Sequence, residues 1–155
     1  GGARETAVLM EAMGRGLVVE PYLATVVMAG KAVALAGSDA QKDELLGAVI
    51  GGEMLMSLAH GELKSRYTIS HVETRAEASG DGWVLNGHKG VVLNGDTADR
   101  LIVSARTSGK TQDEVGISLF VVDPGADGVT VRGYPTNDGG RNDRRSSGYR
   151  STMHT

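Results

Sequence analysis

The spacing of apolar residues changes once along this chain, near Met54, and that change limits the folds open to it. Before Met54 the apolar residues recur with the period of a helix face, and after it they form short alternating runs. All the helical segments come first, unlike the alternating strands and helices of a parallel α/β fold. The sequence therefore predicts an α+β protein, with N-terminal helices followed by an incomplete antiparallel β-barrel or sheet domain.

Three segments are predicted to be helices, at residues 5–15, 21–35 and 38–50. The second is apolar on nearly every face, so we expect it to be buried among other elements. Gly37 follows it and suits the left-handed conformation that often ends a helix. Ser38 and Gln41 have the spacing of a capping box and are expected to open the third helix.

Short apolar runs separated by turn residues predict strands after Met54. A hairpin is predicted from 83–85 and 91–93, joined through Asn86-Gly87, with further strands at 101–105, 117–122 and 129–132. The tail lacks Val, Ile, Leu and Phe, so we expect it to be disordered. The predicted division is the end of a helical domain at 1–53, an incomplete β-domain at 54–136 and a disordered tail at 137–155.

The charge and composition exclude several classes of protein. The chain carries a net charge of -3, and an acidic body argues against nucleic acid as the main partner. The longest apolar stretch, residues 22–36, is too short to span a bilayer and contains Lys31, so no membrane span is expected. The chain has no cysteine, which excludes disulfides and thiolate chemistry. A cytoplasmic location is the default expectation, and the missing initiator Met suggests an internal piece of a longer protein.

Common catalytic motifs are absent from the sequence, including the phosphate loop and the Gly-x-Ser-x-Gly elbow. His60-Gly61-Glu62 is similar to the His-x-Glu of zinc deaminases, but that chemistry needs cysteine ligands. Only the fold can bring His60, His71 and His88 around Glu62, so we expect no metal site. No catalytic residue is predicted within the chain.

Several short segments together resemble one family. They are the Glu62 region, Asp81-Gly82-Trp83-Val84-Leu85-Asn86-Gly87-His88-Lys89, Asn94-Gly95, Ala105-Arg106 and Gly116-Ile117-Ser118-Leu119-Phe120-Val121-Val122-Asp123. Their order and spacing resemble the acyl-CoA dehydrogenases over about residues 1–136. The stretch from Ser57 to Tyr67 is most similar to the branch of pimeloyl-CoA dehydrogenase small subunits. The resemblance implies a piece containing the end of the N-terminal helical domain and most of the middle β-domain.

The resemblance also implies a chemistry and a set of contacts. The family oxidises an acyl-CoA thioester at its Cα–Cβ bond and passes electrons to FAD, with a glutamate base in a C-terminal domain that has no counterpart here. The positions that match the flavin-contacting segments are Leu58, His60, Gly61, Val91, Val92 and Leu93, and Tyr67 matches the substrate-binding region. Gly61 and Leu93 stand where the family has threonines, and Val91 stands where it has tryptophan. For Val91, Val92 and Leu93 the alternative interpretation is ordinary sheet core.

Three functions remain open at this stage. The first is a part of a flavin-dependent acyl-CoA dehydrogenase, inactive alone, with an acyl-CoA substrate and a homo- or hetero-oligomer formed through the missing C-terminal domain. The second is a non-catalytic scaffold subunit of a heteromeric enzyme, and the third is an unrelated α+β binding domain. We also hypothesise that the basic tail after Arg141 is out of frame or foreign.

Overall fold

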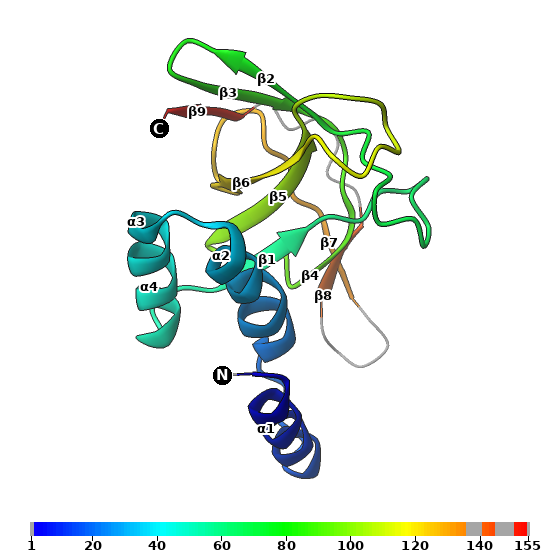
Figure 1. The fold of residues 1–155 in the computed structure, drawn as a ribbon. Helices are drawn as coiled ribbons and strands as arrows, with labels where there is room; N and C mark the ends of the chain where they lie inside the picture. The colour runs from blue at the N-terminus through cyan, green and yellow to red at the C-terminus, as the bar shows by residue number, and fades with distance from the viewer. Residues whose placement is uncertain (1, 136–140, 145–150, 155) are drawn as a thin grey trace.

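The computed structural model describes residues 2–135, 141–144 and 151–154, in which helices and strands occupy separate parts of the molecule (Figure 1). The helices come first in the chain, and the sheets that follow do not close into a barrel. The predicted α+β class is therefore confirmed. Among the residues described, no helix has the length and apolar character needed to cross a membrane.

The first helix, α1 (Ala3–Arg15), extends away from the body of the protein (Figure 1). Its first turn is closed by Glu5, whose carboxylate accepts a hydrogen bond of 2.7 Å from the Gly2 N–H. None of its residues is buried, and Val8 is 64% exposed. α1 therefore adds nothing to the apolar core of the described residues.

Two longer helical segments pack on the sheet, and in each a π-helical stretch continues into an α-helical one. The segments are η1 (Leu23–Gly30) with α2 (Lys31–Ala36), and α3 (Asp39–Gln41) with η2 (Lys42–Leu46) and α4 (Gly47–Ile50). They match the second and third predicted helices closely. The buried residues of η1 include Ala24 and Ala29, as expected for a helix that is apolar on most faces.

The junction between these segments confirms one prediction and corrects another. The Gln41 carboxamide accepts from the Ser38 N–H at 2.9 Å, and the Ser38 hydroxyl accepts from the Gln41 N–H at 3.3 Å, which is the predicted capping box. The predicted left-handed conformation of Gly37 is wrong, because its φ is -71°. A Cβ at Gly37 would lie 2.7 Å from the Val33 carbonyl oxygen, so close approach explains the glycine.

The strands form two sheets. They are β1 (Met56–Ala59), β2 (Arg75–Ser79), β3 (Gly82–Asn86), β4 (Gly90–Leu93), β5 (Arg100–Arg106), β6 (Ile117–Val122), β7 (Gly133–Pro135), β8 (Arg141–Arg144) and β9 (Ser151–His154). The larger sheet has the order β1-β5-β2-β3-β9, with β6 also paired to β5, and the smaller has the order β4-β8-β7. Most pairs in the larger sheet are antiparallel, but β5 runs parallel to β1 and, at one pair, to β2, so this sheet is mixed. The long crossover between β1 and β5 allows this return in the same direction.

The predicted hairpin between β3 and β4 is wrong, since these strands belong to different sheets. The hairpin that forms joins β2 to β3, with Ser79 paired to Gly82. β2 was not predicted, because its sequence lacks the alternation of large apolar and polar residues that indicates a strand; only Ala76 of its five residues is buried. The segment 129–132 is not a strand, and Val129 and Val131 instead pack against the core.

β5 separates two apolar clusters, because alternate residues of a strand face opposite sides of a sheet. On the helix side Ile102 contacts a cluster with Ala29, Val33, Leu45 and Met56. On the other side its neighbours Leu101 and Val103 belong to a cluster that also contains Ala59, Ala76, Leu85, Val92 and Val122. The same alternation places Leu58 on the helix side, where it packs against the cluster of Ile102.

β8 and β9 lie within the segment that the sequence predicts to be disordered. β8 pairs with β4 and β7, and β9 pairs with β3. Such pairing uses backbone groups, so a composition without aliphatic residues does not exclude it. Residues 136–140, 145–150 and 155 lie outside the described residues, and the predicted domain boundaries, like the hypothesis of a foreign tail, stay predictions.

Candidate functional site

The two segments predicted to face a flavin lie beside each other, although a long stretch of chain separates them. The Gly90 N–H donates to the Gly61 carbonyl at 2.9 Å, which joins the start of β4 to the chain after β1. The Ser57 hydroxyl donates to the Leu93 carbonyl at 2.8 Å. A Cβ at Gly61 would lie 3.1 Å from the Gly90 carbonyl oxygen, so the glycine at 61 permits this close contact.

Val91 has an unusual backbone conformation at this contact. Its φ is +56°, the left-handed region that β-branched residues rarely adopt, and the register of β4 with β8 shifts between Gly90 and Val92. The bulge leaves Val91 64% exposed, whereas Val92 is 1% exposed and belongs to the core. The ordinary-core interpretation therefore holds for Val92 and is wrong for Val91. Leu93 is intermediate in exposure.

The other predicted site residues have different surroundings. Leu58 packs against the helix-side cluster, and His60 is half-buried just beyond the end of β1. Tyr67 lies fully exposed on the loop between β1 and β2. The three are not brought into one contact group, but Tyr67 and His60 line the same cavity.

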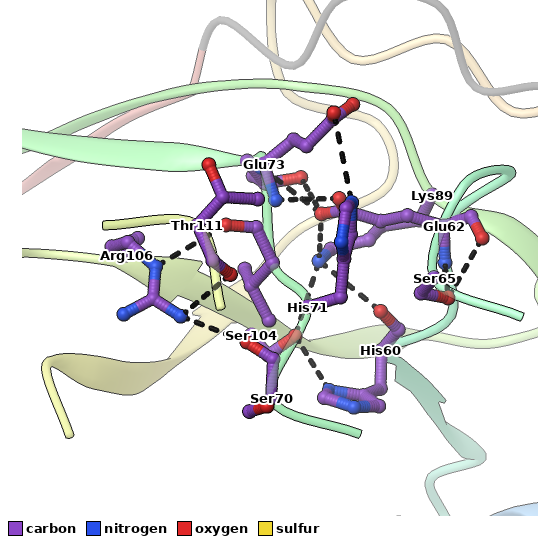
Figure 2. A network of polar contacts seen from close by, with 12 residues as sticks. His60, Glu62, Ser65, Ser70, His71, Glu73, Lys89, Ser104, Arg106 and Thr111 are labelled. Carbon is purple, nitrogen blue, oxygen red and sulfur yellow. Dashed lines mark hydrogen bonds and ion pairs between the residues drawn. The ribbon is translucent and has the colours of Figure 1, made fainter. Parts of the chain in front are cut away.

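A buried ion pair lies behind these segments (Figure 2). The Lys89 ammonium donates to the Glu62 carboxylate at 2.7 Å, to the Ser104 hydroxyl at 3.1 Å and to the His60 carbonyl at 3.3 Å. The side chains of Lys89 and Glu62 are 0% and 3% exposed. A pair this deeply buried is stable only when further hydrogen bonds satisfy its polar atoms.

Both carboxylate oxygens of Glu62 accept such further bonds. Oε1 accepts from the Thr74 hydroxyl at 2.6 Å and from the Thr74 N–H at 3.0 Å, and Oε2 accepts from the Glu73 N–H at 2.6 Å. Burial alone would raise the pKa of Glu62, but the bonds from Lys89, Thr74 and Glu73 outweigh it and hold that pKa below the ordinary value. Burial lowers the pKa of Lys89, against the opposing effect of Glu62. The carboxylate is thus held in its charged form.

His60 is tied to the same network through its side chain. Its Nε2 lies 3.0 Å from the Ile69 carbonyl oxygen, which only accepts, so Nε2 carries the hydrogen. Nδ1 lies 2.9 Å from the Ser104 oxygen and accepts from that hydroxyl when the ring is neutral. Burial and then the charge of Lys89 lower the pKa of His60, although the Ile69 carbonyl and Glu62 act in the opposite direction. The imidazole is therefore kept neutral in one tautomer.

Arg106 organises the loops beside this network (Figure 2). Its side chain is buried, with 1% of the residue exposed, and its guanidinium donates only to backbone carbonyls in the hydrogen bonds recorded for it. These carbonyls belong to Ser70, Val72, Ser108, Thr111, Asp113 and Val115. One side chain therefore holds the loop before β2 against the loop before β6.

A cavity of about 590 Å³ opens between these loops and the end of β1. Its lining mixes aliphatic and polar side chains, namely His60, Tyr67, Ile69, Ser70, Ser104, Glu114, Ile117 and Leu119. Lys89 holds the lining residue Ser104 by a hydrogen bond, and Arg106 holds the backbone of the lining residue Ser70. The arrangement suits a ligand with both apolar and hydrogen-bonding parts.

Comparison with known families shows which family this chain belongs to. The family described as "Acyl-CoA dehydrogenase, middle domain" matches residues 57–149, which is more than half of the chain. The chain belongs to the acyl-CoA dehydrogenase family. The family resemblance inferred from the sequence is therefore confirmed.

Individual relatives agree with this assignment. Isovaleryl-CoA dehydrogenase of Pongo abelii is 34% identical over 96 residues, covering 61% of this chain and 23% of the relative. Butyryl-CoA dehydrogenase of Megasphaera elsdenii is similar in structure, with 25% identity and a TM-score of 0.75 over 84% of this chain and 34% of that one. The ChsE4-ChsE5 complex of Mycobacterium tuberculosis has 26% identity and a TM-score of 0.75 over 93% of this chain and 36% of its counterpart. The chain thus spans about a quarter to a third of the length of such relatives.

One group of residues in this chain has the composition of a metal site. Ligand atoms of Glu62, His71 and Glu73 lie within 4.8 Å of one another. Both carboxylates already form ion pairs with lysines, since Lys89 pairs with Glu62 at 2.7 Å and Lys64 pairs with Glu73 at 3.3 Å. A divalent ion would have to compete with both, so the group is better described as an ion-pair network.

The sequence did not predict the roles of Lys89, Ser104 and Arg106. Ser104 interrupts and Arg106 follows the apolar run of β5, and Lys89 directly precedes that of β4; a charged residue beside such a run is a signal for a buried, paired group. The sequence does not indicate which residues these groups pair with, because Glu62 and Lys89 belong to segments that only the tertiary fold brings together.

Proposed function

We propose that this chain forms the flavin-facing β-domain of an acyl-CoA dehydrogenase that oxidises an acyl-CoA thioester between Cα and Cβ. The observation that carries the proposal is the contact between Gly61 and Gly90, at 2.9 Å, which places the two segments expected to face the flavin side by side. Segments without a shared ligand would have no reason to lie together at the positions that match the flavin-contacting segments of the family. The family membership of the chain supports the same reaction.

The hydrogen bonds that this surface would offer to FAD come from backbone groups. The exposed, bulged Val91 and the side-chain-free Gly61 leave the backbone accessible there, but neither they nor Leu93 offers a hydroxyl to a flavin. When bound, FAD supplies the electron acceptor for the β-hydride while a base removes the α-proton. The residues of this chain would bind and orient the ring and exclude water from one of its faces.

Some of the proposed site residues would contact the flavin through backbone atoms and others through their side chains. Gly61, Val91 and Leu93 would contact the flavin ring through backbone atoms and through the exposed Val91 side chain. Val92 is buried, so only its backbone can take part. Leu58 and His60 would contribute backbone contacts from β1 and the residues after it, and His60 would add the edge of its imidazole ring.

The acyl-CoA substrate, its binding by Tyr67 and the oligomer are parts of the same proposal. Tyr67 is fully exposed at the mouth of the His60 cavity, where it is free to pack on a ligand. The similar proteins named above include two acyl-CoA dehydrogenases and the ChsE4-ChsE5 complex, which supports a homo- or hetero-oligomer completed by a C-terminal domain. We expect the whole protein to act in the cytoplasm.

A second candidate is a non-catalytic scaffold subunit paired with a flavin-bearing partner. The observation that favours it is the loss of ligand side chains, with Gly61 and Leu93 in place of threonines and Val91 in place of tryptophan. A catalytic glutamate and an arginine for the FAD pyrophosphate in the remaining sequence would favour the enzyme.

The test uses the full-length protein, purified alone and with any subunit that copurifies. We expect flavin absorbance in stoichiometric amount and bleaching of that absorbance by one of a panel of acyl-CoA thioesters. The Leu93→Thr variant should change the flavin spectrum, because a hydroxyl is restored next to the ring. Full-length protein that lacks flavin in every preparation would contradict the enzyme and favour the scaffold.

A further inference from the structure

Lys89 joins three parts of the predicted flavin site from behind. It directly precedes Gly90, at the start of β4, so its backbone belongs to one flavin-facing segment. Its ammonium bonds to the carboxylate of Glu62 at 2.7 Å and to the carbonyl of His60 at 3.3 Å, both in the other segment. Its third bond, of 3.1 Å, holds the Ser104 hydroxyl in β5. A single side chain thus fixes the spacing of both segments and the strand behind them.

The same contacts orient a side chain that lines the open cavity. Ser104 accepts a hydrogen bond from Lys89 and lies 2.9 Å from Nδ1 of His60. Because the ammonium occupies one lone pair of the hydroxyl oxygen, the hydroxyl hydrogen is directed to the imidazole. Lys89 therefore acts on both the backbone and the side chain of His60.

The pair is also electrically balanced and almost completely screened from water. Lys89 and Glu62 carry opposite charges at 2.7 Å, with side chains 0% and 3% exposed. Loss of either partner leaves one net charge in a medium of low dielectric constant, where its field reaches nearby groups with little screening. The sign of that charge depends on which partner is removed.

We propose that Lys89, together with Glu62, is a positioning residue of the flavin site, which holds the two segments predicted to face the flavin in place and keeps the buried charge beside them balanced. The inference rests on the proposed function, because it concerns the same site. Neither residue touches the reacting atoms in this assignment.

The experiment uses the full-length holoprotein and the variants Lys89→Met, Glu62→Gln and the double variant. The midpoint potential of the bound flavin is measured over the range of pH about 6 to 9, because burial raises the pKa of an unpaired carboxyl and lowers that of an unpaired ammonium. We expect Lys89→Met to lower the potential, since the remaining carboxylate opposes added negative charge. Glu62→Gln should raise the potential, and the double variant should return it close to the wild-type value. Shifts of the same sign in both single variants, or no shifts, would overturn the proposal.

Affinity for FAD gives a second measurement that does not depend on the single variants folding. The double variant replaces a buried pair by neutral side chains of similar volume, a change that proteins often tolerate. We expect its FAD dissociation constant to rise roughly tenfold, because hydrogen bonds that fix the two segments are lost. A folded double variant with unchanged affinity would exclude a positioning role.

Lys64→Met is the matched control. Lys64 also pairs with a glutamate, Glu73, at 3.3 Å, but their side chains are 74% and 45% exposed. The control should leave both potential and affinity unchanged. Wild-type protein that binds no FAD would refute the proposed function itself, whereas failure of the variant pattern in a protein that binds FAD would refute only the role of Lys89.

Discussion

Two lysine–glutamate pairs lie close together in the sequence but in opposite environments. Lys89 and Glu62 form a buried pair at 2.7 Å, and Lys64 and Glu73 form an exposed pair at 3.3 Å. Water solvates both members of the exposed pair whether or not they meet, so their contact adds little stability. The buried pair has lost that solvation, and its charges depend on each other.

The comparison teaches that residue type does not decide which charged groups hold this domain together. Glu62 accepts a hydrogen bond from the backbone N–H of Glu73, so the two pairs are in direct contact, yet only one is required by its surroundings. Burial and the number of partners separate them. This difference leads to predictions of very different size.

The largest effect is expected for Lys89→Ala. The variant leaves the Glu62 carboxylate buried without its counter-charge, and such changes reduce the free energy of unfolding by about 3–5 kcal/mol. Urea unfolding followed by circular dichroism measures the loss. The comparison with the exposed pair would fail if the variant were destabilised by no more than Lys64→Ala.

A smaller effect is expected on acidification. The folded-state pKa values of His60 and Glu62 are both lowered, so the unfolded chain binds protons more readily than the folded one. The stability from neutral His60 is complete above the ordinary histidine pKa and is lost as the pH falls through its lowered pKa. Glu62 adds a further loss below the ordinary carboxyl range.

His60→Gln is the matched variant for this pH dependence. A glutamine amide can donate to the Ile69 carbonyl and accept from Ser104, as the imidazole does, but it does not titrate. Thermal unfolding measured over the mildly acidic range should therefore depend less on pH in the variant. Equal slopes in the two proteins would mean that His60 is not the titrating group, with Lys89, Glu62 and the cavity residue Glu114 as the other charged groups nearby.

The sequence predicted the helices and the class of the fold well, because these depend on local patterns. The capping box of Ser38 and Gln41 predicted the start of the third helical segment. The apolar run within β5 predicted a strand, and that strand is buried. β2 was missed since its sequence, Arg-Ala-Glu-Ala-Ser, has only one buried residue. Its strand conformation comes from pairing with β3, which local periodicity does not encode.

The candidate site was predicted in part, for the same physical reason. The resemblance predicts that Gly61 and Val91 lie in segments that face a flavin, and the contact of Gly61 with Gly90 brings these segments together, while the flavin contacts stay a prediction. The left-handed conformation of Val91 has no signal in a β-branched residue. The Lys89 network depends on partners from three separated segments, so only the tertiary structure reveals it.

The smallest effect is expected for Lys64→Ala, which tests the exposed member of the comparison. Its side chain is 74% exposed and that of Glu73 is 45% exposed, so solvent replaces the lost contact. We expect the free energy of unfolding to change by about 0–1 kcal/mol, and any change to shrink in high salt because ions screen exposed charges. Urea unfolding at low and high salt measures both quantities. A salt-independent loss as large as that of Lys89→Ala would mean that Lys64 also supports the buried network, through the Glu73 backbone that donates to Glu62 at 2.6 Å.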